Sequence, residues 1–390
     1  MSAPRTIGAV TVARSDFGIL LPVLRAIEAA PDLRLRLFVS GMHLAPHFGH
    51  TVREVEREGF EHVERVPMLL ADDSPEAVSV SVGVGVSAFA RAFARQRPDV
   101  LLVLGDRFEM LTPVVASLPF TIPVAHIHGG ETTEGAMDEA IRHAITKMSH
   151  LHFVTTEPYA RRVVQLGEDP ARVVVSGAPG LDHLGGFRPL AKETLSERVG
   201  MPLDPAPLLV TFHPVTFEQD QTERYIGELL DALDASGHPV VFTYPNADPS
   251  GSLIIEAIDA FAGARDHVVA VQNLGTEAYL SLMGRCAAMV GNTSSGIIEA
   301  ASFELPVVNV GNRQRGRVAG RNVIHTGYSS AEIATAIGQA TEPGFRDGLR
   351  GMANPYGDGR ATERIVERLR SQRLDSSVLA KPFHDLHTAP

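Results

Sequence analysis

The amino-acid sequence predicts an α/β protein of two Rossmann-like, doubly wound domains, with a ligand cleft between them. Three observations support this. Short β-branched runs alternate with amphipathic helical segments, the alternation stops in one stretch rich in glycine and proline, and it then resumes. Strands that alternate with helices form right-handed βαβ units, which place parallel strands in a sheet covered on both faces. Ligands of such folds bind beyond the carboxyl ends of the strands.

The first half of the chain contains five predicted strands. The run "TIGAVTVA" (Thr6–Ala13) is the first, and the helix "GILLPVLRAIEAA" (Gly18–Ala30) follows it. Carboxylates in the first turn of "DEAIRHAITKMSH" predict another helix, because acidic residues favour helix N-termini. The other strands are "LRLRLFVSG", "DVLLVLGD", "IPVAHI" and "LHFVTT". Together these elements predict an N-terminal domain over residues 1–185 that carries the acid–base residues.

Glycine and proline cluster between Pro179 and Pro207 and interrupt this pattern. We expect a linker over residues 186–206, with one short helix near Lys192–Val199. The strands "PLLVTF", "HPVVFTY", "HVVAVQ", "AAMVG" and "LPVVNVG" then predict a C-terminal, nucleotide-binding domain over residues 207–375. Residues 376–390 have weak periodicity and are expected to form an irregular tail.

Composition excludes several classes of protein. The 390 residues carry a net charge of −11, which argues against nucleic acid or an anionic membrane as the main partner. Cys286 is the single cysteine, so neither an internal disulfide nor a zinc-binding cysteine cluster is possible. The N-terminus lacks a signal-peptide pattern, and no apolar run reaches the roughly 18 residues of a membrane span. We therefore expect a soluble, cytoplasmic protein.

Polar residues follow the first and third predicted strands. Arg14 is placed to reach the cleft, whereas Ser15 or Asp16 could cap the following helix. Asp106 and Arg107 come after "DVLLVLG", where the glycine allows the backbone to turn and the aspartate to project into the cleft. The alternative role for Asp106 is an N-cap of the next helix, and this role is compatible with catalysis.

The segment "HIHGGETTEG" is the richest in titratable groups. His126 and His128 share one face of a strand, a double glycine permits a tight turn, and Glu131 follows it. Asp138 opens the next helix. A histidine at a strand end is often structural, but this density of histidines and carboxylates favours acid–base chemistry. Metal binding is the rival hypothesis, although H-x-H with one acid matches no specific metal motif.

A strand–turn–helix in the second half, "MVGNTSSGIIEAA", indicates an anion site. Backbone N–H groups at such a turn point at an anion, and Thr293, Ser294 and Ser295 add hydroxyl groups. Glu299 is predicted to lie inside the following helix, about one turn further on, and could accept two hydroxyls of a ribose. The turn matches neither a dinucleotide-binding glycine motif nor a Walker A loop.

Other strand ends of the second half add candidates for the same ligand. His213 and Asn246 each follow a strand directly, and "NRQRGR" places Arg313, Arg315 and Arg317 after the next. A solvated basic surface is the alternative, and it applies to Arg317 before Arg313. A nucleotide-diphosphate site facing an acid–base site predicts an enzyme that acts on a nucleotide-activated small molecule.

At these residues the sequence resembles the bacterial hydrolysing UDP-N-acetylglucosamine 2-epimerases of sialic acid biosynthesis. The matching segments include "ARSDFGILLPVLRAI", "LGDRFEM", "HIHGGE", "DEAIRHAITKMSHLHF", "FHPVT", "VGNTSSGIIEA" and "NRQRGRVAGRNVI", in order over Thr6–Thr326. The resemblance implies a fold of the GT-B type and conversion of UDP-N-acetylglucosamine and water to N-acetylmannosamine and UDP. It also implies no metal or redox cofactor, UDP-sugar and UDP as ligands, and a homo-oligomer.

Residue roles follow from the resemblance where the motifs match. The implied catalytic residues are Asp106, Glu131, Asp138, His128 and His213, and the implied substrate-binding residues are Arg14, Arg107, Asn246, Thr293, Ser294, Ser295, Glu299 and Arg313. Some members of the family have a glutamate where this chain has His128. Any role of that carboxylate has therefore moved to Glu131 or been lost.

Three other functions share parts of this pattern. The same reaction on UDP-2,4-diacetamido-2,4,6-trideoxyglucose, from legionaminic acid synthesis, would use the same motifs. A glycosyltransferase of the same fold would need an acceptor but not the acid cluster. The third is a catalytically silent nucleotide-sugar sensor, against which the intact acids and histidines argue. Non-hydrolysing epimerases have the same fold, but "HIHGGE" and "GRVAGRNVI" favour the hydrolysing branch.

Overall fold

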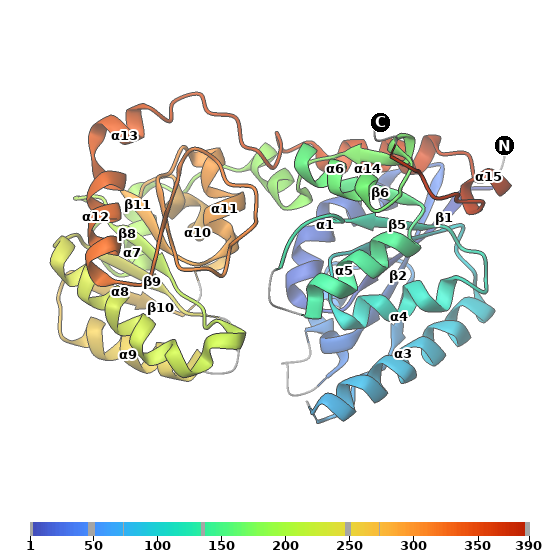
Figure 1. Cartoon of the computed structure of the whole chain (residues 1–390), viewed down its shortest axis with the longest axis horizontal. Coiled ribbons are helices and arrows are strands. Elements are labelled where there is room, and N and C mark those ends of the chain that lie inside the picture. The colour runs from blue at the N-terminus through green and yellow to red at the C-terminus, as the bar shows by residue number, and fades with distance from the viewer. Residues whose placement is uncertain are drawn as a thin grey trace. The chain divides into compact units, whose positions relative to one another are not determined.

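The computed structural model describes residues 3–45, 51–72, 74–133, 137–245, 251–272 and 274–386. The chain forms two compact units. Unit 1 comprises Met1–Glu131, Met137–Gly185 and Tyr356–Pro390, and unit 2 comprises Thr132–Ala136 and Gly186–Pro355. Each unit is an α/β structure with helices around its own sheet (Figure 1).

Over its described residues, unit 1 contains a seven-stranded parallel sheet of order β3-β2-β1-β4-β5-β6-β7. The strands are β1 (Arg5–Thr11), β2 (Leu33–Ser40), β3 (Val63–Val66), β4 (Val100–Leu104), β5 (Val124–Ile127), β6 (Leu151–Val154) and β7 (Val173–Val175). The helices are α1 (Arg14–Ala29), α2 (Val52–Arg57), α3 (Pro75–Arg95), α4 (Phe108–Ser117), α5 (Met137–Met148), α6 (Glu157–Gln165), α14 (Ala361–Ser371) and α15 (Ser376–Leu379), with 3-10 turns η1 (Gly41–Leu44) and η3 (Pro170–Arg172).

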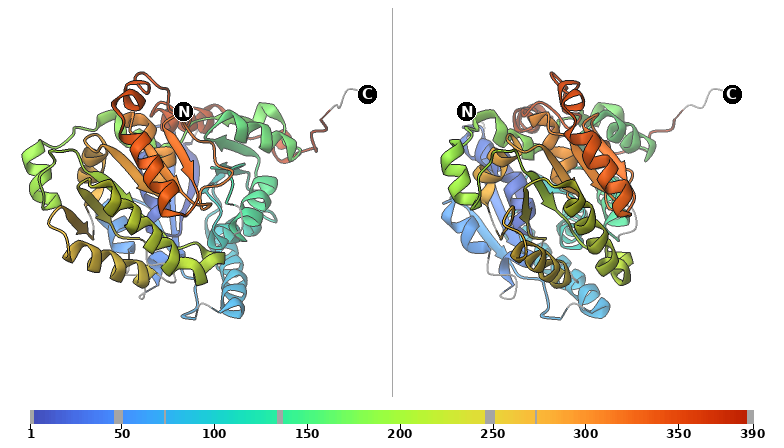
Figure 2. Two further views of the ribbon diagram at one scale, coloured as in Figure 1. Left: turned by 60° about the vertical axis from the view of Figure 1, so that its left-hand side comes forward. Right: turned by 90° about the vertical axis from the view of Figure 1, so that its left-hand side faces the viewer.

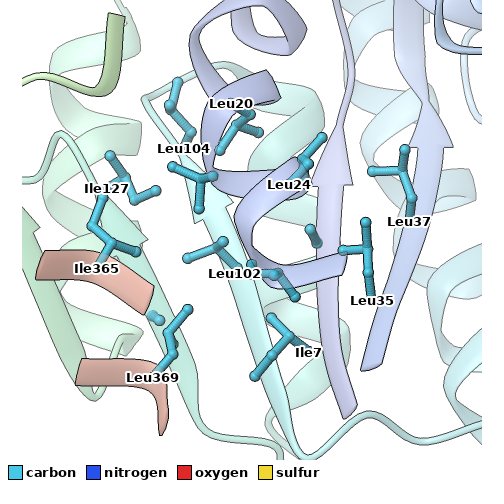
Figure 3. Packing of buried hydrophobic residues seen from close by; sticks show 14 of the residues in the cluster. Ile7, Leu20, Leu24, Leu35, Leu37, Leu102, Leu104, Ile127, Ile365 and Leu369 are labelled. Atoms are coloured by element: carbon cyan, nitrogen blue, oxygen red, sulfur yellow. The ribbon is translucent and has the colours of Figure 1, made fainter. Parts of the chain in front are cut away.

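Both faces of this sheet are buried under helices (Figure 2). The central strand β4 is apolar at every position and fully buried, as expected for a parallel strand covered on both sides. On one face, Leu20 and Leu24 of α1 belong to one cluster with Leu102 and Leu104 of β4, and Ile365 of α14 lies near Ile127 (Figure 3). On the other face, α3, α4 and α5 contribute the apolar side chains of a second cluster.

The last part of the chain returns to unit 1, so the observed division of the chain differs from the predicted domain boundaries. The sequence predicts one domain over 207–375, whereas Tyr356–Pro390 belongs to unit 1 and α14 packs beside α1. The predicted linker, residues 186–206, is part of unit 2, and its helix α7 (Lys192–Val199) packs against α10 (Gly275–Met283). The 3-10 turn η4 (Pro179–Gly186) contains the point in the sequence where unit 1 ends and unit 2 begins. The apolar stripe of α14 indicates that one face of the helix is buried, but it does not indicate which of the two sheets covers that face.

We predict that Leu369→Ala lowers the free energy of unfolding by about 2–5 kcal/mol, because the side chain is fully buried and its removal leaves a cavity. Urea denaturation followed by circular dichroism measures this change. Leu379→Ala, at an exposed position of α15, is the matched control and should change stability little. Equal stability of the two variants would contradict the packing of α14 on unit 1.

Where its residues are described, unit 2 has a six-stranded parallel sheet of order β10-β9-β8-β11-β12-β13. The strands are β8 (Leu208–Thr211), β9 (Val240–Thr243), β10 (Val268–Val271), β11 (Ala288–Gly291), β12 (Val307–Val310) and β13 (Val323–Thr326). The remaining helices are α8 (Thr222–Ser236), α9 (Gly251–Gly263), α11 (Ser294–Ile298), α12 (Ser330–Thr341) and α13 (Pro343–Asp347), with 3-10 turns η5 (Thr216–Gln221) and η6 (Ala300–Phe303). This order is that of a doubly wound fold, as predicted.

The sequence analysis missed strands at the edges of the sheets. β3 and β7 close the two sides of the first sheet, and β13 closes one side of the second. Polar residues interrupt β3 (VERV) and β13 (VIHT), and β7 has only three residues, so none of the three shows the apolar run of four or more residues that marks a central strand.

By length and composition alone, helix α3 is long and apolar enough to cross a membrane, although the sequence has no continuous apolar run of about 18 residues. The helix has 21 residues, and an 18-residue window of it has a mean hydropathy of 1.6. Glycine and serine interrupt its apolar run without lowering the mean hydropathy much. In unit 1 this helix packs against α4 and buries Phe89 and Phe93 in the core.

Candidate active site

The ends of β4 and β5 bring two predicted loops together in unit 1. Leu104 pairs with Ile127, so Gly105 and His128 leave the sheet at the same edge. His126 is fully buried, and its Nε2 donates to the carbonyl oxygen of Gly105 at 2.8 Å. Burial lowers the pKa of His126 to about 3, so the ring stays neutral. His126 therefore holds the Gly105 turn in place.

Asp106 forms an ion pair with Arg142, a buried residue of α5. The alternative N-cap role of Asp106 is wrong, because the N-cap of α4 is Arg107. The Arg107 side chain makes no capping hydrogen bond. Arg142 was not among the predicted site residues, although it lies one turn after Asp138. A buried guanidinium beside a carboxylate favours the ionised carboxylate.

Arg107 lies among several carboxylates. Its Nη2 and Nε contact the two carboxylate oxygens of the fully buried Glu109 at 3.1 and 3.2 Å. Its charge also acts on Asp16 and Asp138. Burial raises the pKa of Asp138 above its ordinary value, while the Arg107 cation opposes this shift. Asp138 thus retains a proton more readily than an exposed aspartate does.

The predicted double-glycine turn after β5 is confirmed. Gly130 has φ +76°, and a Cβ there would lie 2.6 Å from the carbonyl oxygen of Tyr159. Glu131 is buried at the exit of the turn, where it accepts a hydrogen bond from Thr155 at 2.9 Å. The Nδ1 of His128 is 3.6 Å from the Glu131 carboxylate. Within the described structure, the buried Nε2 of His128 has no hydrogen-bond partner.

Arg14 and Asp16 take different positions at the start of α1. Arg14 is the first residue of the helix, and its side chain is 64% exposed and 3.3 Å from Glu54. The N-cap of α1 is Ala13 rather than the predicted Ser15 or Asp16; Asp16 is buried in the first turn of the helix, where it accepts hydrogen bonds from the backbone N–H groups of Val12 and Ala13. Burial raises its pKa to about 7, against the hydrogen bonds that favour the ionised form.

In unit 2, the turn after β11 is built on Gly291 and Asn292. Gly291 has φ +136°, and a Cβ at this position would lie 2.0 Å from the Thr211 carbonyl oxygen. The Asn292 side chain accepts from the His213 backbone N–H at 2.7 Å and donates to its carbonyl at 2.8 Å. Burial, assisted by the charge of Arg313, lowers the pKa of His213 to about 3. His213 is therefore a fixed, neutral group next to this turn.

The turn leads into α11, where the predicted hydroxyls lie. Thr293 is the N-cap, and its Oγ1 accepts from the Ser295 N–H at 3.4 Å, while Ser294 begins the helix. Glu299 directly follows the helix rather than lying inside it. Burial raises the pKa of Glu299 to about 7, and its buried Oε2 has no hydrogen-bond partner among the described residues.

Tyr279 of α10 joins this group and was not predicted. Burial raises the pKa of its phenol, while hydrogen bonds with Ser295 and Thr211 oppose the shift. In sequence it resembles an ordinary core aromatic of "TEAYLSLM", so only the fold reveals its neighbours.

Arg313 donates from Nη1 to the carbonyl oxygen of Asn292 at 3.2 Å. Asn246 lies outside the described residues. The structure thus assembles two groups. Unit 1 contains the predicted residues Arg14, Asp106, Arg107, His128, Glu131 and Asp138. Unit 2 contains the predicted residues His213, Thr293, Ser294, Ser295, Glu299 and Arg313. Arg14 differs from the others of unit 1 in that its side chain is mostly exposed.

The described residues contain no group of three or more His, Cys, Asp or Glu side chains that could hold a metal ion. The paired histidines of "HIHGG" have other contacts: His126 bonds to Gly105 and Thr146, and His128 lies against Glu131. Both histidines thus lie against protein groups in the described structure.

Comparison with known proteins agrees with these features. The family model described as UDP-N-acetylglucosamine 2-epimerase matches residues 25–370. A Campylobacter jejuni protein named GDP/UDP-N,N'-diacetylbacillosamine 2-epimerase (hydrolyzing) is 37% identical over 98% of this chain and 99% of its own. A Neisseria meningitidis UDP-N-acetylglucosamine 2-epimerase is 34% identical over 97% and 98% of the two chains.

The fold is also that of solved structures. The crystal structure of the UDP-GlcNAc 2-epimerase from Neisseria meningitidis bound to UDP-GlcNAc superposes with a TM-score of 0.80 at 18% identity, covering 94% of this chain and 100% of that one. This match confirms the predicted fold of two Rossmann-like domains of the GT-B type. From its sequence, its fold and its matching family model, the chain belongs to the UDP-N-acetylglucosamine 2-epimerase family.

Proposed function

We propose that the protein is a hydrolysing 2-epimerase of a UDP-activated 2-acetamido sugar. The first candidate reaction converts UDP-N-acetylglucosamine and water to N-acetylmannosamine and UDP. The observation that supports it is a pair of aspartates in unit 1 that lie in different environments. Asp106 is paired with the buried Arg142, whereas burial raises the pKa of Asp138. One site thus contains a carboxylate suited to accept a proton and another suited to hold one.

The reaction needs both groups. A base removes the proton from sugar C2 while the bond between C1 and the UDP oxygen breaks, which leaves a glycal and free UDP. Water then adds across the double bond, with its hydroxyl at C1 and a proton at C2 from the opposite face. In this proposal Asp106 accepts the C2 proton and Asp138 returns one. Glu131, which lies 3.6 Å from His128, would orient the attacking water.

The second group of residues supplies the nucleotide site of the proposal. Ser294 and the backbone N–H groups of the turn after β11 would bind the diphosphate, with Arg313 providing positive charge to the leaving group. The unpartnered Oε2 of Glu299 would accept a ribose hydroxyl. A ligand hydroxyl there would satisfy a buried oxygen that otherwise lacks a partner.

A second candidate substrate is UDP-N,N'-diacetylbacillosamine, the UDP form of 2,4-diacetamido-2,4,6-trideoxyglucose. It is favoured by the Campylobacter jejuni relative, which is named for this sugar and matches almost the whole chain. Both candidates have the same acetamido group at C2, so the chemistry above applies to each.

The reaction is tested by running it in D₂O with each UDP-sugar. We expect release of UDP and a free sugar that carries one deuterium at C2 with inverted configuration, because the C2 hydrogen exchanges with solvent. Mass spectrometry and proton NMR of the product measure both. The sugar that is turned over with the higher kcat/KM identifies the substrate.

A glycosyltransferase or simple hydrolase breaks only the bond at C1 and leaves hydrogen at C2. A product without deuterium at C2 would therefore contradict the epimerase proposal. Binding of a UDP-sugar without UDP release would instead favour a sensor.

We predict that Glu299→Ala weakens UDP binding by about tenfold or more, the usual effect of losing a hydrogen bond to a charged group. Isothermal titration calorimetry measures the UDP dissociation constant. Glu277→Ala, at an exposed position of α10, is the matched control and should leave the constant unchanged. Unchanged UDP affinity in Glu299→Ala would place the ribose elsewhere.

A further inference from the structure

Unit 2 contains a pocket of about 460 Å³ between the loops that follow β12 and β13. Arg315 and Arg317 of the "NRQRGR" segment line it, whereas none of the residues assigned above to the nucleotide or acid–base groups does. Its polar lining side chains include Asn309, Asn312, Gln314, Arg315, Arg317 and His325. The volume falls in the range of pockets that bind small molecules.

The charge of this pocket favours an anion. Two arginines and a histidine line it, and no aspartate or glutamate is among its described lining residues. The nearby Glu218 already has a partner on each carboxylate oxygen, Asn312 at 2.7 Å and the Tyr225 hydroxyl at 2.9 Å. In a chain of net charge −11, the two arginines on this pocket favour a negatively charged ligand.

One wall of the pocket is fixed without a ligand. The Tyr328 ring stacks on Tyr225, with 3.5 Å between centroids and 4° between planes. Its hydroxyl donates to the Asn312 side chain at 2.9 Å. Gly311, at φ +75°, allows this approach, since a Cβ there would lie 2.1 Å from the tyrosine ring. A preformed wall lowers the entropic cost of binding.

Gln314 connects the pocket to the turn after β11. It is almost fully buried, and its Nε2 donates to the Asn292 carbonyl oxygen at 2.9 Å. The Asn292 side chain in turn holds the backbone of His213. The buried Oε1 of Gln314 has no partner in the described part of the chain, and a hydroxyl-bearing ligand could provide one.

We propose that this pocket binds a sugar that carries one anionic group, and that its occupation changes UDP affinity through Gln314 and Asn292. Arg315 and Arg317 bind the anion, and the amides of Asn309 and Gln314 bind hydroxyls. The anionic group can be a phosphate or a carboxylate, because arginine recognises both. The binding itself is independent of the proposed function, whereas the effect on UDP rests on the nucleotide site proposed above.

The test is calorimetry of the full chain in saturating UDP, which occupies the nucleotide site. The probes are N-acetylglucosamine 6-phosphate for the phosphate class, glucuronic acid for the carboxylate class and neutral N-acetylglucosamine as the uncharged comparison. We expect saturable binding of at least one anionic probe and none of the neutral sugar. Arg315→Gln should weaken it by about tenfold or more. Arg321→Gln, an exposed arginine of the same connection that does not line the pocket, is the matched control and should bind normally.

Absence of saturable binding by both anions, or equal loss in Arg315→Gln and Arg321→Gln, would overturn the site. Displacement of the probe by UDP would assign the binding to the nucleotide site instead.

The coupling is measured by titrating UDP with and without the probe, where a change of about fivefold or more in the dissociation constant of UDP is expected. An unchanged UDP constant would overturn the coupling alone. A failed D₂O experiment with retained probe binding would overturn the epimerase proposal and leave the pocket assigned.

Discussion

The Asp106→Asn protein is expected to turn over its UDP-sugar about 10²-fold or more slowly than the wild type, the usual loss when an acid–base group is removed. The amide keeps the size of the carboxylate but cannot accept the C2 proton. Arg142 would also lose the charge that it pairs with inside the protein. UDP affinity should change little, because the residues proposed to bind the nucleotide are in unit 2.

Steady-state UDP release and C2 deuterium incorporation measure this effect, and both should fall together if they belong to one elimination. Asp99→Asn is a matched control at the opposite end of β4, where its carboxylate accepts a hydrogen bond from the Thr6 N–H. It should affect stability more than turnover. Near-normal kcat in Asp106→Asn would show that another residue is the base.

The Gly291→Ala protein is expected to lose about 3 kcal/mol or more of stability, together with most of its UDP affinity. At φ +136° an L side chain is strained, and the new Cβ would lie 2.0 Å from the Thr211 carbonyl oxygen. The backbone of the turn must therefore move. Asn292, which holds His213 in place, follows directly and would move with it.

Thermal or urea unfolding gives the change in the free energy of unfolding, and calorimetry gives the dissociation constant of UDP. Gly227→Ala, inside α8, is the matched control, because a Cβ there has no neighbour within 4 Å. Alanine is the better helix residue, so this control should be neutral or slightly stabilising. Equal behaviour of the two variants would show that the turn tolerates a side chain.

The sequence by itself determined the main elements of both sheets and the residues at their carboxyl ends. Central strands such as β4 and β11 are short apolar runs that a local pattern reveals. The double glycine after β5 likewise predicts a turn from local backbone preference alone. Because parallel strands end at one edge of a sheet, the residues that follow them could be predicted to lie together.

Tertiary structure decided which partners these residues have. Whether Asp106 caps α4 or pairs with Arg142 depends on the position of α5, which no local pattern specifies. Tyr279 is indistinguishable in sequence from a core aromatic, and its contacts with Ser295 and Thr211 arise from the packing of α10.

The same reason explains the division of the chain and the pocket beyond β12 and β13. The sequence analysis placed residues 361–371 in the second domain, whereas the structure shows that α14 packs on the sheet of unit 1. Arg315 and Tyr328 belong to separate loops that the β12–β13 pairing brings together. Sequence periodicity reports which face of an element is buried, whereas the partner of that face is chosen by contacts between residues far apart in the chain.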